Sequence, residues 1–76
     1  MNEKDIALFL MLNEPSFEVG AVQYSVSCPG KGYATWDSAG NTFDYPDLQA
    51  LLEKWMVGGK PFRDRIEELM EQYQTN

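Results

Sequence analysis

Few residues of this sequence could carry out catalysis, because it contains no histidine and only one cysteine, Cys28. The commonest general base is therefore missing, together with the partner that would activate a serine or cysteine nucleophile. Zinc sites built from histidine or from several cysteines are excluded for the same reason. Cys28 has the apolar parity of a predicted strand, which favours a small buried core residue over a reactive thiol. We therefore expect no enzymatic activity, no cofactor and no metal.

Two glycine-containing segments look like ligand-binding loops, and both are interpreted as turns. Residues 29–32 read Pro-Gly-Lys-Gly, but a phosphate-binding P-loop is longer and ends in Lys-Ser/Thr at the start of a helix. A strand is predicted to follow residues 29–32 instead. Residues 37–44 place acids near a glycine, as calcium loops do, without the regular ligand spacing of an EF-hand.

Acidic side chains gather on one side of the last predicted helix: Asp64, Glu67, Glu68 and Glu71. Paired carboxylates can act as acid and base in a cleft, but these lie opposite the apolar stripe of the helix, where solvent is the usual neighbour. Two interpretations remain open. The acids either keep the protein soluble, or they form an acidic strip that docks on lysine and arginine of a partner. Arg63 and Arg65 beside them would weaken the field of such a strip.

Length and charge restrict the class of protein further. A chain of 76 residues is expected to form one domain, residues 1–76. Its net charge of −6 argues against direct binding to DNA, RNA or anionic membranes, and it permits a protein or ribonucleoprotein partner with a basic surface. The lone cysteine, the acidic start and the short apolar run at residues 6–12 predict a soluble cytoplasmic protein without signal peptide or membrane span.

The elements that must position these residues begin with a small antiparallel sheet of three to four strands, within about residues 4–45. Residues 6–12 are compatible with a buried strand or a short helix, and we favour the strand. Residues 17–28 are predicted to be extended, with a bulge or bend at Gly20, where the apolar positions change parity. After a turn at residues 29–32, residues 33–37 and 42–45 are predicted to form a hairpin.

One face of this sheet is predicted to be apolar and the other wet. Val22, Tyr24 and Val26 share a parity, and we expect the larger hairpin side chains to point the same way: Ala34, Trp36, Phe43 and Tyr45. The wet face would then carry the candidate partner-binding residues Gln23, Ser25, Tyr33, Thr35 and Asp37. Tyr33 is the best candidate anchor, because tyrosine is enriched at binding hot spots. A strand edge could also pair with a partner or with a second copy.

Two helices are predicted after the sheet, at about residues 45–57 and 61–73. Asp44 as a cap and Pro46 in the first turn mark the start of the first helix, and Gly58-Gly59 mark its end. Its apolar stripe consists of Leu48, Leu51, Leu52, Trp55 and Met56, and the stripe of the second helix consists of Phe62, Ile66, Leu69, Met70 and Tyr73. Both stripes need cover, so we expect both helices on one face of the sheet, in an α+β fold.

Two segments in the last third of the chain resemble a small phage anti-CRISPR protein family that inhibits a type I-F surveillance complex. These segments are Glu53-Lys54-Trp55-Met56-Val57-Gly58 and Arg65-Ile66-Glu67-Glu68-Leu69-Met70. The resemblance implies a sheet followed by two helices and a compact inhibitor, active in the host bacterial cytoplasm, that occupies a nucleic-acid-binding surface. The family's contact residues lie in its first hairpin, which has no clear counterpart here, so none of them is transferred.

The middle of the chain is similar to the HicB-type antitoxins. The similarity lies in Tyr24-Ser25-Val26-Ser27-Cys28-Pro29, the glycine-rich turn, Asn41-Thr42-Phe43 and the amphipathic helix that follows. Those proteins usually carry a separate DNA-binding segment, and no basic helix is present here. Our first hypothesis is therefore a non-enzymatic protein-binding inhibitor, monomeric or homodimeric, and the alternative is an antitoxin or a small homo-oligomeric subunit.

Overall fold

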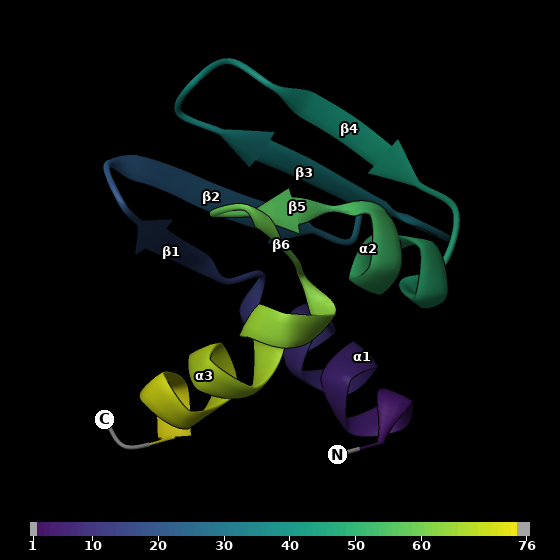
Figure 1. Cartoon of the computed structure of the whole chain (residues 1–76). Coiled ribbons are helices and arrows are strands. Elements are labelled where there is room, and N and C mark those ends of the chain that lie inside the picture. The colour runs from purple at the N-terminus through teal and green to yellow at the C-terminus, as the bar shows by residue number, and fades with distance from the viewer. Residues whose placement is uncertain (1, 75–76) are drawn as a thin grey trace.

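A computed structural model describes residues 2–74 of the chain, with side chains as far as residue 72. It contains an antiparallel meander of four strands in the order β1-β2-β3-β4, a separate two-stranded sheet, and three helices (Figure 1). The elements are α1 (Glu3–Asn13), β1 (Ser16–Val19), β2 (Val22–Ser27), β3 (Tyr33–Asp37), β4 (Thr42–Tyr45), α2 (Leu48–Lys54), β5 (Met56–Val57), β6 (Lys60–Pro61) and α3 (Arg63–Gln74). The α+β class is confirmed, and a helix precedes the sheet where the strand was the favoured of two alternatives.

The N-terminal apolar run forms helix α1, so the favoured assignment as a strand is wrong. The side chain of Asn2 caps the helix by accepting a hydrogen bond from the backbone N–H of Asp5 at 2.9 Å. The helix ends at Glu14, whose φ of 39° is left-handed. The four-stranded sheet consequently begins at Ser16 and not near residue 4. The buried positions have helical spacing and consist of Ile6, Phe9 and Leu10.

The parity change at Gly20 marks a hairpin turn and not a bulge. Val19 pairs with Val22, and Gly20 takes a φ of 66° in the two-residue turn between them. This pairing brings Phe17 opposite Tyr24, with their rings stacked at a centroid distance of 5.9 Å. The apolar side chains of β1 and β2 therefore lie on the same face of the sheet, although their parities differ along the sequence.

The side chains of strand β3 point to the opposite faces of the sheet from those predicted. In the register of β2 with β3, Tyr24 pairs with Asp37 and Val26 pairs with Thr35. Thr35 and Asp37 are accordingly buried on the core face, with 4% and 6% of their surfaces exposed. On this strand the correction also moves Tyr33 to the core face, and it moves Ala34 and Trp36 to the face that points away from the helices.

The reason for this difference is that alternation along one short strand fits either parity. The sequence argument assumed that a tryptophan must point inward, but the register across the neighbouring strands decides the orientation. Asp37 can be buried because its carboxylate accepts hydrogen bonds from the backbone N–H groups of Ala39 and Asn41, at 3.0 and 3.1 Å. On β4 the prediction holds: Phe43 shares the core face with Thr35, although it is half exposed because β4 is an edge strand.

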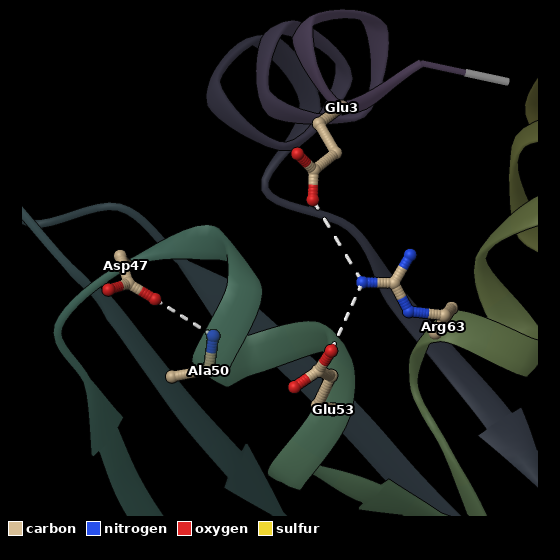
Figure 2. Close-up of polar contacts among 5 residues, drawn as sticks. All are labelled: Glu3, Asp47, Ala50, Glu53 and Arg63. Carbon is tan, nitrogen blue, oxygen red and sulfur yellow. Dashed lines mark hydrogen bonds and ion pairs between the residues drawn. The ribbon is translucent and has the colours of Figure 1, made fainter.

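Helix α2 is shorter than predicted at both ends, spanning Leu48–Lys54 and not residues 45–57. Asp47, and not Asp44, is the cap, and it accepts a hydrogen bond from the N–H of Ala50 at 2.8 Å (Figure 2). The helix ends at Lys54, and the chain continues into the β5–β6 hairpin. Gly58 and Gly59 form the turn of this hairpin with φ values of 61° and 84°, which glycine adopts at little cost.

One apolar cluster holds the sheet and all three helices together. Trp55 and Phe62 pack at a ring-centroid distance of 4.7 Å, and Phe17 of β1 contacts both rings. The other buried side chains are Ile6, Phe9, Leu10, Tyr24, Val26, Leu51, Leu52, Val57, Ile66, Leu69 and Met70. The predicted stripes of both C-terminal helices are thus confirmed in their buried members, except that Met56 is exposed. The side chain of Tyr73 lies outside the described residues.

Polar contacts of two arginines connect the helices to each other and to the small hairpin. The guanidinium of Arg63 lies 3.9 Å from Glu3 of α1 and 3.7 Å from Glu53 of α2 (Figure 2). These pairs are exposed, so each contributes at most about 1 kcal/mol. Arg65 donates hydrogen bonds to the backbone carbonyls of Val57 and Gly58, each at 3.0 Å.

No helix within residues 2–74 is both long and apolar enough to cross a membrane.

Candidate interaction surface on the sheet

The four-stranded sheet has one face that no helix within residues 2–74 covers, which we call the open face. Strand alternation and the observed register place on it the residues that are opposite or diagonal to one another across neighbouring strands. These residues are Ser16, Glu18, Gln23, Ser25, Ser27, Ala34, Trp36, Thr42 and Asp44. They come from all four strands, so the sheet itself fixes their relative positions.

Trp36 is the most prominent residue of the open face. It is 48% exposed, although tryptophan is highly buried on average. Its cross-strand neighbours are the short side chains of Ser25 on β2 and Thr42 on β4, which leave much of the indole accessible. A hollow of about 240 Å³ lies beside it, lined by Glu14, Ser25, Val26, Ser27, Ala34, Thr35 and Trp36. A large amphipathic ring with room beside it is typical of an interface anchor.

The charge of the open face is negative. None of the residues that form β1 to β4, all of which are described, is lysine or arginine. Glu18 and Asp44 are exposed on this face, and Glu14 lines the hollow beside Trp36. Carboxylates around an exposed indole suit a partner that presents lysine or arginine, because such a cation can pair with the acids and lie against the ring.

Two of the predicted partner-binding residues of the sheet lie on the open face, and three do not. Gln23 and Ser25 are placed as predicted. Tyr33, the predicted anchor, is half buried on the core face, and burial raises the pKa of its phenol above the ordinary value. Thr35 donates a hydrogen bond to the carbonyl of Phe43 at 3.4 Å, and Asp37 caps the β3–β4 turn. Thr35 and Asp37 are therefore structural residues.

The acidic strip on α3 forms a second exposed surface, separate from the open face. As predicted, its four members are exposed: Asp64, Glu67, Glu68 and Glu71. Because α3 packs on the core side of the sheet, the strip and the open face point in different directions and cannot contact one flat surface together. The arginines that flank the strip are already engaged, Arg63 with two carboxylates and Arg65 with backbone carbonyls.

Trp36 is the residue that sequence reasoning missed as a surface anchor. The hydrogen bonds that Asp37 accepts from Asn41 hold Asp37 toward the chain, and only the structure shows them. If Asp37 turns inward, its neighbour Trp36 must turn outward. Sequence alone gives no reason to prefer this aspartate as a buried residue over a tryptophan.

Metal and nucleophile chemistry have little support among the side chains that the structure describes. No group of three or more histidine, cysteine, aspartate and glutamate residues within them could hold a metal ion. Burial and the nearby Glu14 carboxylate raise the pKa of the Cys28 thiol, which disfavours the reactive thiolate. Comparison with known proteins finds no family model, no curated protein and no solved structure that matches this chain.

Proposed function

We propose that this protein is a non-enzymatic inhibitor that binds a basic surface of another macromolecule through its open face. One observation carries the proposal: a half-exposed Trp36 stands among acidic and small polar side chains on strands that contain no basic residue. Exposing an indole gains nothing for the stability of the chain, whereas tryptophan is enriched at the centre of protein interfaces. Neighbouring carboxylates supply specificity and steer the encounter.

The target class that fits this chemistry is a protein surface that normally binds nucleic acid. Such a surface presents lysine and arginine to phosphates, and the carboxylates of Glu14, Glu18 and Asp44 offer it an alternative anion. The resemblance of the last third of the chain to an anti-CRISPR family suggests one concrete target, the nucleic-acid-binding surface of a type I-F surveillance complex. A HicB-like antitoxin would use the same chemistry on a small toxin.

The first experiment measures binding to a purified type I-F surveillance complex by biolayer interferometry, with target-DNA binding followed in parallel. We expect the chain to bind and to reduce DNA binding. Trp36→Ala should weaken the affinity by about 30-fold or more, the effect of a hot-spot residue, while the melting temperature falls by at most a few degrees. Glu18→Lys and Asp44→Lys should slow association most strongly at low salt.

A matched control separates the two acidic surfaces. Glu68→Lys changes the charge of the α3 strip by the same amount as Glu18→Lys changes that of the open face, and both residues are exposed. We expect Glu68→Lys to leave the affinity nearly unchanged. A loss with Glu68→Lys but none with Trp36→Ala would assign binding to α3 and overturn the open-face proposal.

A pull-down from bacterial lysate tests the target class if this complex is not bound. A small toxin retained by the wild type and lost with Trp36→Ala would support the antitoxin alternative and keep the open face as the site. A basic nucleic-acid-binding protein lost with the same variant would keep the inhibitor proposal with another target. Equal recovery by wild type and variant would remove the open face from both.

A further inference from the structure

Helix α1 is apolar on two sides, and only one of them is covered. Its inner side packs into the core, whereas Leu8, Met11 and Leu12 on its outer side are 51%, 60% and 70% exposed. A helix that is apolar all round is normally buried all round. The outer side of α1 therefore has the composition of a buried surface, but no other part of the described chain covers it.

A hollow lies next to this exposed stripe. It has a volume of about 370 Å³ and is formed where α1 meets the β2–β3 connection. Its lining consists of Lys4, Ala7, Leu8, Met11, Cys28, Gly30, Lys31, Gly32 and Tyr33. Leu12, the most exposed large hydrophobic residue among the described side chains, is outside this lining and projects from the next part of the same helix. The outer side of α1 thus has an exposed apolar side chain, Leu12, and beside it a hollow that could receive the Leu12 side chain of a second copy.

These features are complementary to themselves under a twofold axis. If two copies of α1 pack antiparallel with the axis near the middle of the stripe, Leu12 of each copy lies over Ala7 and Leu8 of the other, at the hollow. Antiparallel helices also oppose their dipoles, which favours the arrangement. Any other partner would have to supply this match independently, whereas a second copy supplies it by symmetry.

The charges of the stripe follow the same symmetry. Lys4 and Lys31 line the hollow, with Lys4 near the start of α1, and the exposed Glu14 lies at the other end of the helix. Antiparallel packing brings Lys4 of each copy toward Glu14 of the other. Within the described residues neither lysine forms an ion pair in the single chain, so Lys4 is available for this contact.

We propose that the outer side of α1 is the interface of a homodimer with twofold symmetry. The outer side of α1 from Lys4 to Leu12 is only about 12 Å long, so the interface is smaller than that of a stable complex and belongs with weak, transient association. We expect a weak dimer that forms as the concentration rises. The strands of the open face lie outside this interface, and the two surfaces share only Glu14 at the end of α1.

Sedimentation velocity of the full chain, from about 10 μM to about 1 mM, tests the proposal in the range where small interfaces associate. The wild type should shift from monomer to dimer. Leu12→Glu should remain monomeric with an unchanged melting temperature, because this side chain is mostly exposed in the monomer. The matched control is Met56→Glu, which places the same charge on another exposed apolar residue, 52% exposed and outside the hollow, and should dimerise like the wild type.

A charge exchange tests the orientation. Lys4→Glu and Glu14→Lys should each weaken the dimer by about 3-fold or more, and the double variant should recover most of the loss. Glu14 also accepts a hydrogen bond from the N–H of Cys28 at 3.2 Å, so melting temperatures are compared to separate a folding defect from an interface defect. A monomer at every concentration would overturn the proposal, as would a dimer that Leu12→Glu leaves intact. A dimer lost with Trp36→Ala but not with Leu12→Glu would move the interface to the open face.

Discussion

The two faces of the four-stranded sheet use the same strands for different purposes. On the core face even the polar residues have partners in the chain, as the hydrogen-bonded carboxylate of Asp37 shows. On the open face the largest residue, Trp36, has only short side chains opposite it and remains half exposed. The composition of the core face is explained by folding, whereas the choice of a tryptophan at position 36 is not. The comparison therefore separates residues retained for stability from a residue available for binding.

The largest effect is expected from comparing the stability of two variants, each lacking an aromatic side chain of one face. Phe17 is 8% exposed and contacts Tyr24, Trp55 and Phe62, so Phe17→Ala should lower the free energy of unfolding by about 3–5 kcal/mol. Trp36→Ala should lower it by only about 0–1 kcal/mol. Urea unfolding followed by circular dichroism measures both. Equal losses would show that Trp36 is a packing residue.

The next test compares one aspartate of each face. Asp37→Ala removes the acceptor for two backbone N–H groups and the side chain of Asn41, so we expect a loss of about 1–3 kcal/mol. Asp44→Ala on the adjacent strand removes an exposed carboxylate and should change stability by less than about 0.5 kcal/mol. If both variants unfold at the same urea concentration, the capping role assigned to Asp37 is wrong.

A smaller effect is expected from filling the open face beside the indole. Ser25→Thr adds a methyl group opposite Trp36 and raises strand propensity, so stability should change by only about 0–0.5 kcal/mol, most often upward. The same methyl group narrows the access to the ring and should weaken partner binding. Thermal melts and binding measurements on one preparation check both. A gain in stability with no loss of affinity would place the contact elsewhere on the sheet.

The smallest expected effect is a decline in stability at alkaline pH that comes from the core face alone. Burial raises the pKa values of Cys28, Tyr33 and Tyr45 above their ordinary values of 9.0 for cysteine and 10.0 for tyrosine, and all three have core-face parity. The folded chain thus keeps these protons where the unfolded chain has lost them. This contribution to stability is complete below pH 9.0 and is lost as the pH rises through the folded-state pKa values.

Urea unfolding of the wild type and of Cys28→Ser at several pH values from neutral to alkaline measures this effect. The variant should lose less stability than the wild type in the lower part of the alkaline range, because in the unfolded chain the thiol, with an ordinary pKa of 9.0, loses its proton before the phenols, with an ordinary pKa of 10.0. An identical alkaline decline in both proteins would mean that the thiol contributes nothing to it. Trp36→Ala keeps all three groups with raised pKa values, so it should show the same alkaline decline as the wild type and serves as the control.

Several elements could be predicted because their signals are local. The stripe of Leu51, Leu52 and Trp55 determined the buried side of α2, and the alternation of Tyr24 and Val26 determined the core face of β2. Gly58 was recognised as a left-handed residue, but its turn was placed at a helix end and not in a hairpin. The run Ile6 to Leu12 was assigned to the wrong element, because a continuous apolar run has no period and its cap, Asn2, precedes it.

The sequence by itself determined the class of this protein: an acidic α+β chain without histidine, whose large apolar residues are sufficient for one core. Only the tertiary structure decided which side chains that core leaves out. The orientation of β3 depends on its register with β2, and a shift by one residue would exchange Trp36 for Asp37. Likewise, only the inner side of α1 packs into the core. Its outer leucines, Leu8 and Leu12, are therefore exposed. Both candidate surfaces therefore result from packing between distant segments, which no local pattern in the sequence records.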